Sequence, residues 1–405
     1  MSGQRASRSE HRLLLVTGHR WLDACRHALA AREAGFAVHL LAPKRHPIAA
    51  LEWVNTVEAF SALRPHRTVA NALNAMPFDL VVPIDDLGAS ALFETYLDGM
   101  LSNEAALTVE RSLGDPASFG IRHARAEIGQ IATRAGLAAP GTWPLREDTL
   151  ASDLETAGFP AVLKTDGSFG GQQVIVVDDL DAARAGYLAL SRPPRLLGAF
   201  GQLVLDHDET SLRPALARSR SPVSVQQFVN GGPATMSVAA WEGEMLGYVG
   251  SRALQTQPGN GPATIIEPLQ HPDLERAARV IASELGLSGL FGLDFVLAPD
   301  RSTASLIELN PRATPTAHLR PPSLHRPLFH LLADSLGMAA PPPRPALPEG
   351  PIGLFPQAAT ADPGGTHALP AHLDLPREQD VVDLCRAELA TRPPGALERV
   401  IRRVF

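Results

Sequence analysis

The chain has 405 residues, of which 45% are apolar, and it carries a formal net charge of −7. This length predicts two or three domains, and the apolar fraction argues against a largely disordered chain. Lys and Arg form no long run, so neither nucleic acid nor an anionic membrane surface is expected as the main partner. No apolar stretch approaches the length of a membrane span.

The two cysteines, Cys25 and Cys385, lie far apart in the sequence and show no metal-binding spacing. This usage is typical of a reduced protein without a disulfide framework. The N-terminus is polar, and the apolar run "LLLVTG" after it is too short for the core of a signal peptide. We therefore expect a cytoplasmic protein.

Residues 1–112 predict a Rossmann-like α/β domain. Strand-like runs at 11–18 and 37–43 flank a helical pattern at 21–35, which is a strand–helix–strand unit of a mostly parallel sheet. At 78–90 another strand runs into two aspartates and then a helix, and loops in this position commonly carry ligand sites. No G-x-G-x-x-G follows the first strand, so a dinucleotide site of that type is not expected.

Residues 113–337 predict an α+β region in two parts, 113–222 and 223–337. The pattern gives helices at 122–136 and 271–286, a strand, Gly-rich turn and strand at 159–177, and further strands at 223–229, 236–250, 289–300 and 305–312. Residues 338–405 begin with a Pro-rich linker and end with a helix near 378–391.

Lys164 ends the apolar strand "PAVLK" and is followed at once by the loop "TDGSFGG". A strand-end lysine can simply extend its ammonium to water, and Asp-Gly is also common in hairpin turns. However, three glycines within five residues allow backbone N–H groups to surround an anion. We interpret Lys164 and this loop as a phosphate-binding site that is not of the Walker type.

The segment "VQQFVNGG" at 225–232 is a strand that passes into a glycine pair. Its backbone can offer hydrogen bonds to an adenine edge, with Phe228 and Val229 as apolar contacts. An ordinary core strand is the alternative.

The segment "SLIELNPR" at 305–312 carries Glu308, Asn310 and Arg312 at every second position. In an extended chain these side chains share one face. Asp294 ends the preceding strand-like run, so a hairpin would bring the oxygen ligands that Mg²⁺ prefers together with an arginine that can grip a phosphate. A surface strand with a Glu–Arg pair is the alternative.

In this order, the motifs "VLKTDGSFGG", "VQQFV", "FGLDF" and "IELNPR" resemble those of the ATP-grasp superfamily, over roughly residues 1–335. The resemblance implies a Rossmann-like domain followed by two α+β subdomains that bind ATP between them. It also implies an ADP-forming ligase, which activates a carboxylate as an acyl phosphate that an amine, or less often a thiol, then attacks.

The resemblance further implies a role for each candidate residue. Phosphate-binding residues would be Lys164 and the loop residues Gly167, Ser168, Gly170 and Gly171, and the adenine pocket would contain Gln226, Gln227, Phe228 and Val229. Ligands of Mg²⁺, or of Mn²⁺ in its place, would be Asp294, Glu308 and Asn310. Arg312 would steady the transferred phosphoryl group, and Arg252 would lie nearest the acyl phosphate, under a loop containing Asn260 and Gly261.

The sequence departs from the family pattern at three positions. Where many relatives have a lysine for ATP, Arg125 stands here, with Arg122 as a second choice. No glutamate after 229 is placed to hold the ribose, and Asp294 stands where some relatives have Glu.

Two other functions remain open, a kinase-like phosphotransferase and a non-catalytic nucleotide-binding regulator. The complete set of polar residues argues against an inactive site. We expect the carboxylate and amine pocket to involve the segment 251–264 and residues Asp85, Asp86, His318 and Arg320, although both aspartates could instead cap a helix. The segment after 338 could cover the site or form a homodimer contact.

Overall fold

The N-terminal domain is a four-stranded parallel sheet covered by helices. The structure is a computed structural model, and it describes residues 10–165, 174–196, 210, 212–218, 220–257, 262–358 and 372–391. The sheet order is β3-β2-β1-β4, and all its pairings are parallel. Its elements are β1 (Arg12–Val16), α1 (Asp23–Glu33), β2 (Ala37–Pro43), the 3₁₀ turn η1 (Pro47–Ala50), β3 (Asn55–Phe60), α2 (Pro65–Ala75), β4 (Leu80–Pro83), α3 (Asp86–Leu97) and α4 (Asn103–Leu113). The predicted Rossmann-like domain is confirmed.

A small antiparallel sheet follows, in the order β5-β8-β6-β7. The 3₁₀ turn η2 (Pro116–Ile121) and α5 (Arg125–Arg134) lead to it, and its elements are β5 (Thr142–Leu145), α6 (Leu150–Ala157), β6 (Ala161–Thr165), β7 (Val174–Val177), α7 (Leu180–Leu190), α9 (Leu212–Ala217) and β8 (Val223–Gln227). Leu163 and Val225 on one face pack with α6 and α7. The opposite face carries Lys164 and Gln226.

A large seven-stranded sheet has the order β13-β12-β9-β10-β11-β14-β15. Its elements are β9 (Gly232–Trp241), β10 (Glu244–Thr256), β11 (Ala263–Pro268), α10 (Pro272–Glu284), β12 (Gly289–Leu297), β13 (Ala304–Asn310), α11 (Leu328–Ser335), β14 (Ile352–Gly353) and β15 (His372–Leu373), and α13 (Gln379–Thr391) follows. One face packs on α10 and α5, and the other faces α11 and the N-terminal domain. Among the described residues, no helix has both the length and the apolar character of a membrane span.

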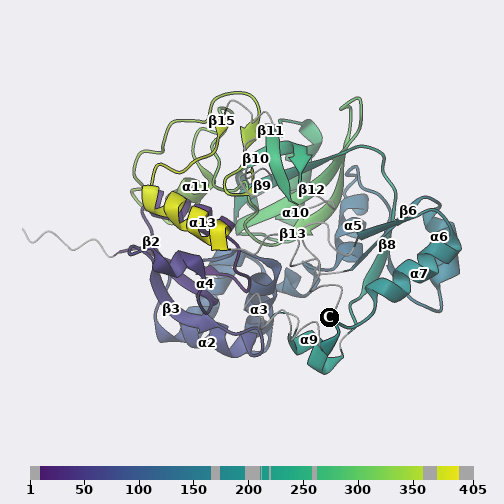
Figure 1. Ribbon diagram of the computed structural model, residues 1–405, viewed down its shortest axis with the longest axis horizontal. Coiled ribbons are helices and arrows are strands. Elements are labelled where there is room, and N and C mark those ends of the chain that lie inside the picture. The colour runs from purple at the N-terminus through teal and green to yellow at the C-terminus, as the bar shows by residue number, and fades with distance from the viewer. Residues whose placement is uncertain are drawn as a thin grey trace, which may run out of the picture.

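In Figure 1 the large sheet lies above the N-terminal domain, and the small sheet lies to the right of both. The predicted boundary at 223 does not separate the two sheets, because β8 pairs with β5 and β6 of the small sheet. Likewise, the segment after 338 is not detached, because β14 and β15 extend the large sheet.

The last helix, α13, lies against the N-terminal domain (Figure 1). Trp53 Nε1 donates a hydrogen bond to Asp380 Oδ2 at 2.9 Å, and Arg20 forms an ion pair with Glu388 at 3.1 Å. The C-terminal segment therefore connects the large sheet to the first domain.

Candidate active site

The hairpin of β12 and β13 brings the predicted metal ligands together. In its register Asp294 lies directly opposite Glu308, and Gly292 lies opposite Asn310. Residues opposite each other in an antiparallel pair point to the same face. Accordingly, Asn310 Nδ2 donates a hydrogen bond to Asp294 Oδ2 at 3.0 Å.

A β-bulge at Ile307 adjusts this strand in a way that simple alternation does not predict. The register passes from Glu308 to Leu306 between two consecutive residues of β12, so Ile307 is the extra residue. As a result, Leu306 and Leu309 both enter the same core, although they are three positions apart. The Ile307 carbonyl instead accepts a hydrogen bond from Gln226 Nε2 of the small sheet at 3.3 Å.

Two arginines hold the hairpin's polar groups. Arg125 Nη2, from the start of α5, forms an ion pair with Glu308 Oε1 at 2.5 Å. Arg312 Nη2 donates a hydrogen bond to Asn310 Oδ1 at 3.2 Å, and its Nε donates to Asp86 Oδ2 at 2.9 Å. Burial acts to lower the pKa of Arg312, but the Asp86 carboxylate acts in the opposite direction and the pKa lies above its ordinary value.

Arg122, the second choice for the ATP-binding cation, has a structural role. Its guanidinium donates hydrogen bonds to the carbonyls of Leu113, Asp115 and Leu285 and to the Ser118 hydroxyl, and it lies over the Phe119 ring at 4.7 Å. Burial lowers its pKa to about 9. Arg125, in contrast, contacts Glu308 of the β12–β13 hairpin. The structure therefore favours Arg125 over Arg122 as the candidate cation.

Lys164 lies on the small-sheet face that carries Gln226, as expected for a nucleotide contact. Its side chain is 5% exposed, and Nζ donates a hydrogen bond to Gln226 Oε1 at 2.8 Å. Burial lowers the pKa of Lys164, and the neighbouring Arg125 adds to this effect. Among the described residues, a neutral amide is the one hydrogen-bond partner of this ammonium, although the nearby Glu308 carboxylate acts to raise its pKa. A buried ammonium in this setting is well suited to receive an anion.

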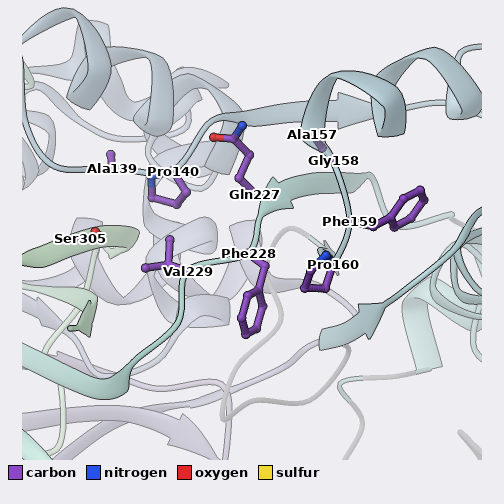
Figure 2. A pocket seen from close by; sticks show the side chains of 10 residues that line it. All are labelled: Ala139, Pro140, Ala157, Gly158, Phe159, Pro160, Gln227, Phe228, Val229 and Ser305. Atoms are coloured by element: carbon purple, nitrogen blue, oxygen red, sulfur yellow. The ribbon is translucent and has the colours of Figure 1, made fainter. Parts of the chain in front are cut away.

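Gln227, Phe228 and Val229 line a cavity of about 320 Å³ at the end of β8, together with Pro140, Phe159, Pro160 and other residues. Figure 2 shows Gln227 and Phe228 leaving the same segment, with Pro140 on one side and Pro160 on the other. The volume is at the lower end of ligand pockets, ~300–1,000 Å³. Gln227 pairs with Ala161 on the face opposite Lys164 and Gln226, so this cavity and the lysine ammonium lie on different faces of the small sheet.

The hairpin offers a suitable donor set for a hard divalent cation, namely two carboxylates and an amide oxygen. Burial raises the pKa of Glu308, and Asp294 opposite it adds to this rise while Arg125 lowers it. Two half-buried carboxylates at paired positions therefore favour a cation between them. Within the described ranges no three His, Cys, Asp or Glu side chains are placed so that they could hold a metal ion, so the amide of Asn310 is needed to complete the set.

The two aspartates after β4 have different roles. Asp85 is fully buried and is the N-cap of α3. Its carboxylate accepts hydrogen bonds from Thr17 Oγ1 (2.6 Å) and from the backbone N–H groups of Gly18 (2.8 Å), His19 (2.9 Å) and Gly88 (2.7 Å). Although burial opposes it, hydrogen bonds from His19 and these other donors lower the pKa of Asp85 to about 2. Asp85 thus organises the loop after β1, whereas Asp86 holds Arg312.

Arg252 is not brought together with these residues. Arg252 lies opposite Ala234 of β9, and Ala234 lies opposite Phe295 of β12. Asp294, the residue before Phe295, lies opposite Thr235 instead. Because successive residues in a strand point to opposite faces, Arg252 is on the other face of the large sheet from Asp294. There it forms an ion pair with Glu267 at 2.6 Å, and its catalytic role stays a prediction.

The predicted loop residues Gly167, Ser168, Gly170, Gly171, Asn260 and Gly261 lie outside the described residues.

His318 and Arg320, the predicted substrate contacts, have protein partners. His318 Nε2 contacts Asp374 Oδ2 at 2.6 Å, and Arg26 of α1 forms an ion pair with the same carboxylate at 2.5 Å. Arg320 donates hydrogen bonds to the carbonyls of Leu324 and His325 in its own loop. His318 therefore belongs to a buried charge network, and Arg320 stabilises a loop.

Sequence reasoning missed several residues at the junction of α1 with the C-terminal segment. Asp23 and Arg26 begin α1, while Gln357 and Asp374 come from the C-terminal segment, more than 300 positions away. Gln357 Nε2 donates a hydrogen bond to Asp23 Oδ1 at 2.5 Å. No local motif identifies such a pair, because only the extension of the large sheet by β14 brings it together.

Comparisons with known proteins agree with this architecture. No protein-family model and no curated protein sequence matches the chain. Among solved structures, carboxyaminoimidazole ribonucleotide synthase from Aspergillus clavatus with ATP is 14% identical, with a TM-score of 0.54, 83% of this chain covered and 78% of that chain. The biotin carboxylase domain of Hydrogenobacter thermophilus 2-oxoglutarate carboxylase, with MgADP and bicarbonate, is 13% identical, with a TM-score of 0.55 and coverages of 83% and 72%.

A third solved structure, N5-carboxyaminoimidazole ribonucleotide synthetase from Thermus thermophilus, is 15% identical, with a TM-score of 0.54 and coverages of 84% and 81%. These likenesses confirm the predicted fold class, a Rossmann-like domain followed by a two-subdomain ATP-grasp fold. The resemblance read from the motifs is thereby confirmed at the level of the fold.

Proposed function

We propose that the chain is an ATP-dependent, ADP-forming ligase that activates a carboxylate as an acyl phosphate and joins it to an amine. The single observation that carries this proposal is the paired placement of Asp294 and Glu308, with Asn310 and Arg312 on the same hairpin. The solved structures of the same fold support it, because one was determined with ATP and another with MgADP and bicarbonate.

In this proposal each residue acts by position and charge. Lys164 and Arg125 bind the ATP phosphates. The adenine lies along the segment 226–229. Asp294, Glu308 and Asn310 hold Mg²⁺, or Mn²⁺ in its place, which supplies neutralisation of the triphosphate charge when it is bound.

Arg312 then stabilises the charge that develops on the transferred phosphoryl group. Its guanidinium is held from two sides, by Asp86 and by the Asn310 amide oxygen, so it is already oriented before substrates bind. Preorganised charge of this kind accounts for much of the catalysis of phosphoryl transfer, which needs no nucleophilic side chain.

The test is a screen of amino acids and small carboxylates with amines, in the presence of ATP and Mg²⁺, in which ADP and phosphate are both measured. A ligase releases both products only when a carboxylate and an amine are present together. ADP without free phosphate would instead identify a phosphotransferase, and no turnover with any pair would favour a nucleotide-binding protein without catalysis.

A further inference from the structure

Asp23, in the first turn of α1, has a carboxylate that its surroundings leave largely unsatisfied. Its Oδ1 accepts a hydrogen bond from Gln357 Nε2 at 2.5 Å. Within the described part of the chain, no other donor and no ion pair reaches this carboxylate. A carboxylate can accept about four hydrogen bonds, so most of its acceptor capacity remains for a ligand.

Gln357 adds a second free acceptor at the same place. Its side chain is only 9% exposed, and no hydrogen-bond donor in the described residues reaches Oε1. Because the amide nitrogen and oxygen share one carbon atom, Oε1 lies close to the Asp23 carboxylate to which the nitrogen donates. A buried acceptor without a partner is costly, so Oε1 is available to a donor from a bound ligand.

The two nearby arginines, Arg312 and Arg26, do not pair with the Asp23 carboxylate, because each is bound to another acid. Arg312 is paired with Asp86 at 2.9 Å, and Arg26 is paired with Asp374 at 2.5 Å. Burial raises the pKa of Asp23 to about 6, although both arginines act in the opposite direction. Asp23 is therefore close enough to Arg312 to feel its charge without being neutralised by it.

The start of α1 is fixed beside the segment that follows the metal strand. The Arg312 guanidinium lies over the Trp21 ring, 5.9 Å from its centroid. One turn further along α1, His27 Nε2 contacts the Thr314 carbonyl oxygen at 3.0 Å. Asp23 lies between Trp21 and His27 in the chain, on the stretch that contacts Arg312 and Thr314.

We infer that Asp23 and Gln357 Oε1 bind the amine substrate, and that Asp23 accepts the proton its nitrogen releases. This inference rests on the proposed ligase function. A neutral primary amine has two N–H donors and one lone pair, so two protein acceptors can hold both hydrogens and leave the lone pair directed at the acyl carbon. The substrate class is thus a primary amine, bound at the junction of α1 and the C-terminal segment.

The reaction transfers the acyl group from phosphate to the amine nitrogen. The amine nitrogen forms a bond to the acyl carbon, and the bond from that carbon to the phosphate oxygen breaks. Phosphate leaves with the bonding electron pair and takes a proton from solvent. The proton that the nitrogen releases passes to the Asp23 carboxylate and is then lost to solvent, so the enzyme returns to its starting state.

The experiment compares Asp23→Asn and Gln357→Leu with wild type, using the carboxylate and primary amine that the screen identifies. A parallel assay uses hydroxylamine, which traps acyl phosphates as hydroxamates. The matched control is Glu104→Gln, which removes an exposed first-turn carboxylate from α4, another eleven-residue helix. The expected result is a rise of at least about tenfold in the KM for the amine in Asp23→Asn, which loses a hydrogen bond to a charged group. Gln357→Leu loses a neutral hydrogen bond and should raise this KM about twofold to tenfold, and both variants should change the KM for ATP much less.

Amine KM and kcat values equal to those of Glu104→Gln would overturn the inference, while hydroxamate formation by wild type would leave the ligase proposal standing. Absence of hydroxamate and of phosphate release by wild type with every carboxylate would overturn the ligase function, and this inference with it. Asp23→Glu provides a further test, because partial recovery of the amine KM is expected if a carboxylate, rather than the shape of the side chain, binds the amine.

Discussion

The β12–β13 hairpin and the junction of α1 with the C-terminal segment both present polar groups near Arg312, but they are built differently. In the hairpin, Asp294 and Glu308 belong to adjacent strands and face each other through a regular register. At the junction, Asp23 and Gln357 meet across more than 300 residues of sequence. The residues proposed to act on the nucleotide can thus be predicted from local sequence pattern, whereas those proposed to bind a second substrate depend on how distant segments assemble.

The two regions also differ in how completely their charges are satisfied. Glu308 has Arg125, and Arg312 has Asp86 and Asn310. Asp23 has one amide donor within the described residues. We expect substitutions in the hairpin to abolish all turnover, and those at the junction to affect mainly one substrate.

The largest effect is expected from Glu308→Gln. Loss of a metal-binding carboxylate from the hairpin should reduce Mg²⁺-dependent ATP turnover more than roughly 100-fold, because even outer contacts of metal sites contribute 10–100-fold. Steady-state ADP formation measures this, with circular dichroism to check the fold. Glu284→Gln, exposed at the end of α10, is the control, and full activity in Glu308→Gln would remove the metal assignment.

Asp85→Ala should act on stability instead. It removes the N-cap of α3 and leaves buried N–H donors without an acceptor, which costs about 3 kcal/mol in the free energy of unfolding. Because the pKa of Asp85 is lowered from 3.8 to about 2, its ionised form contributes about 2 kcal/mol above pH 4, and this is lost as the pH falls toward 2. Urea titration of Asp85→Ala and wild type at pH 7 and pH 3 measures both effects, and equal free energies of unfolding would contradict this role.

Lys164→Ala should weaken ATP binding by about 10-fold or more, because a charge-assisted hydrogen bond to phosphate contributes about 1.5–3 kcal/mol. The KM for ATP and direct titration of the nucleotide both report this change. Lys44→Ala, at an exposed lysine, is the matched control. Unchanged ATP affinity would mean that Lys164 only supports the small sheet.

The smallest effect is expected from Arg252→Met. Because Arg252 lies on the face of the large sheet opposite Asp294, kcat should change less than about threefold. Loss of its partly exposed ion pair with Glu267 should lower the free energy of unfolding by roughly 0.2–1 kcal/mol. Arg279→Met removes another surface ion pair, with Glu275, and serves as the control. A loss of kcat greater than about tenfold would restore the catalytic role that the family resemblance implies.

The sequence predicted the fold class and the placement of Asp294, Glu308 and Asn310 on one hairpin, because both rest on local rules. Strand and helix periodicity identified the N-terminal domain, and alternation in 305–312 identified Glu308, Asn310 and Arg312 as neighbours. The bulge at Ile307 was not predictable, because the need for it appears only when Leu306 and Leu309 enter one core. The different roles of Asp85 and Asp86 were likewise not predictable, since their partners, Thr17 and Arg312, lie in distant segments.

The junction was beyond sequence reasoning for the same physical reason. Gln357 follows a Pro-rich stretch that reads as a linker, and its contact with Asp23 exists only because β14 pairs with β11 and carries the segment back to the first domain. Arg122 and Arg125 show the converse case, in which two arginines three residues apart look equivalent until their partners are known.

The central claim is tested most directly by measuring ADP and free phosphate together, with ATP, Mg²⁺ and paired carboxylate and amine substrates. The account predicts equal amounts of ADP and phosphate, which require both substrates and are lost in Glu308→Gln. ADP formation without phosphate release, or equal product formation by Glu308→Gln and wild type, would contradict it.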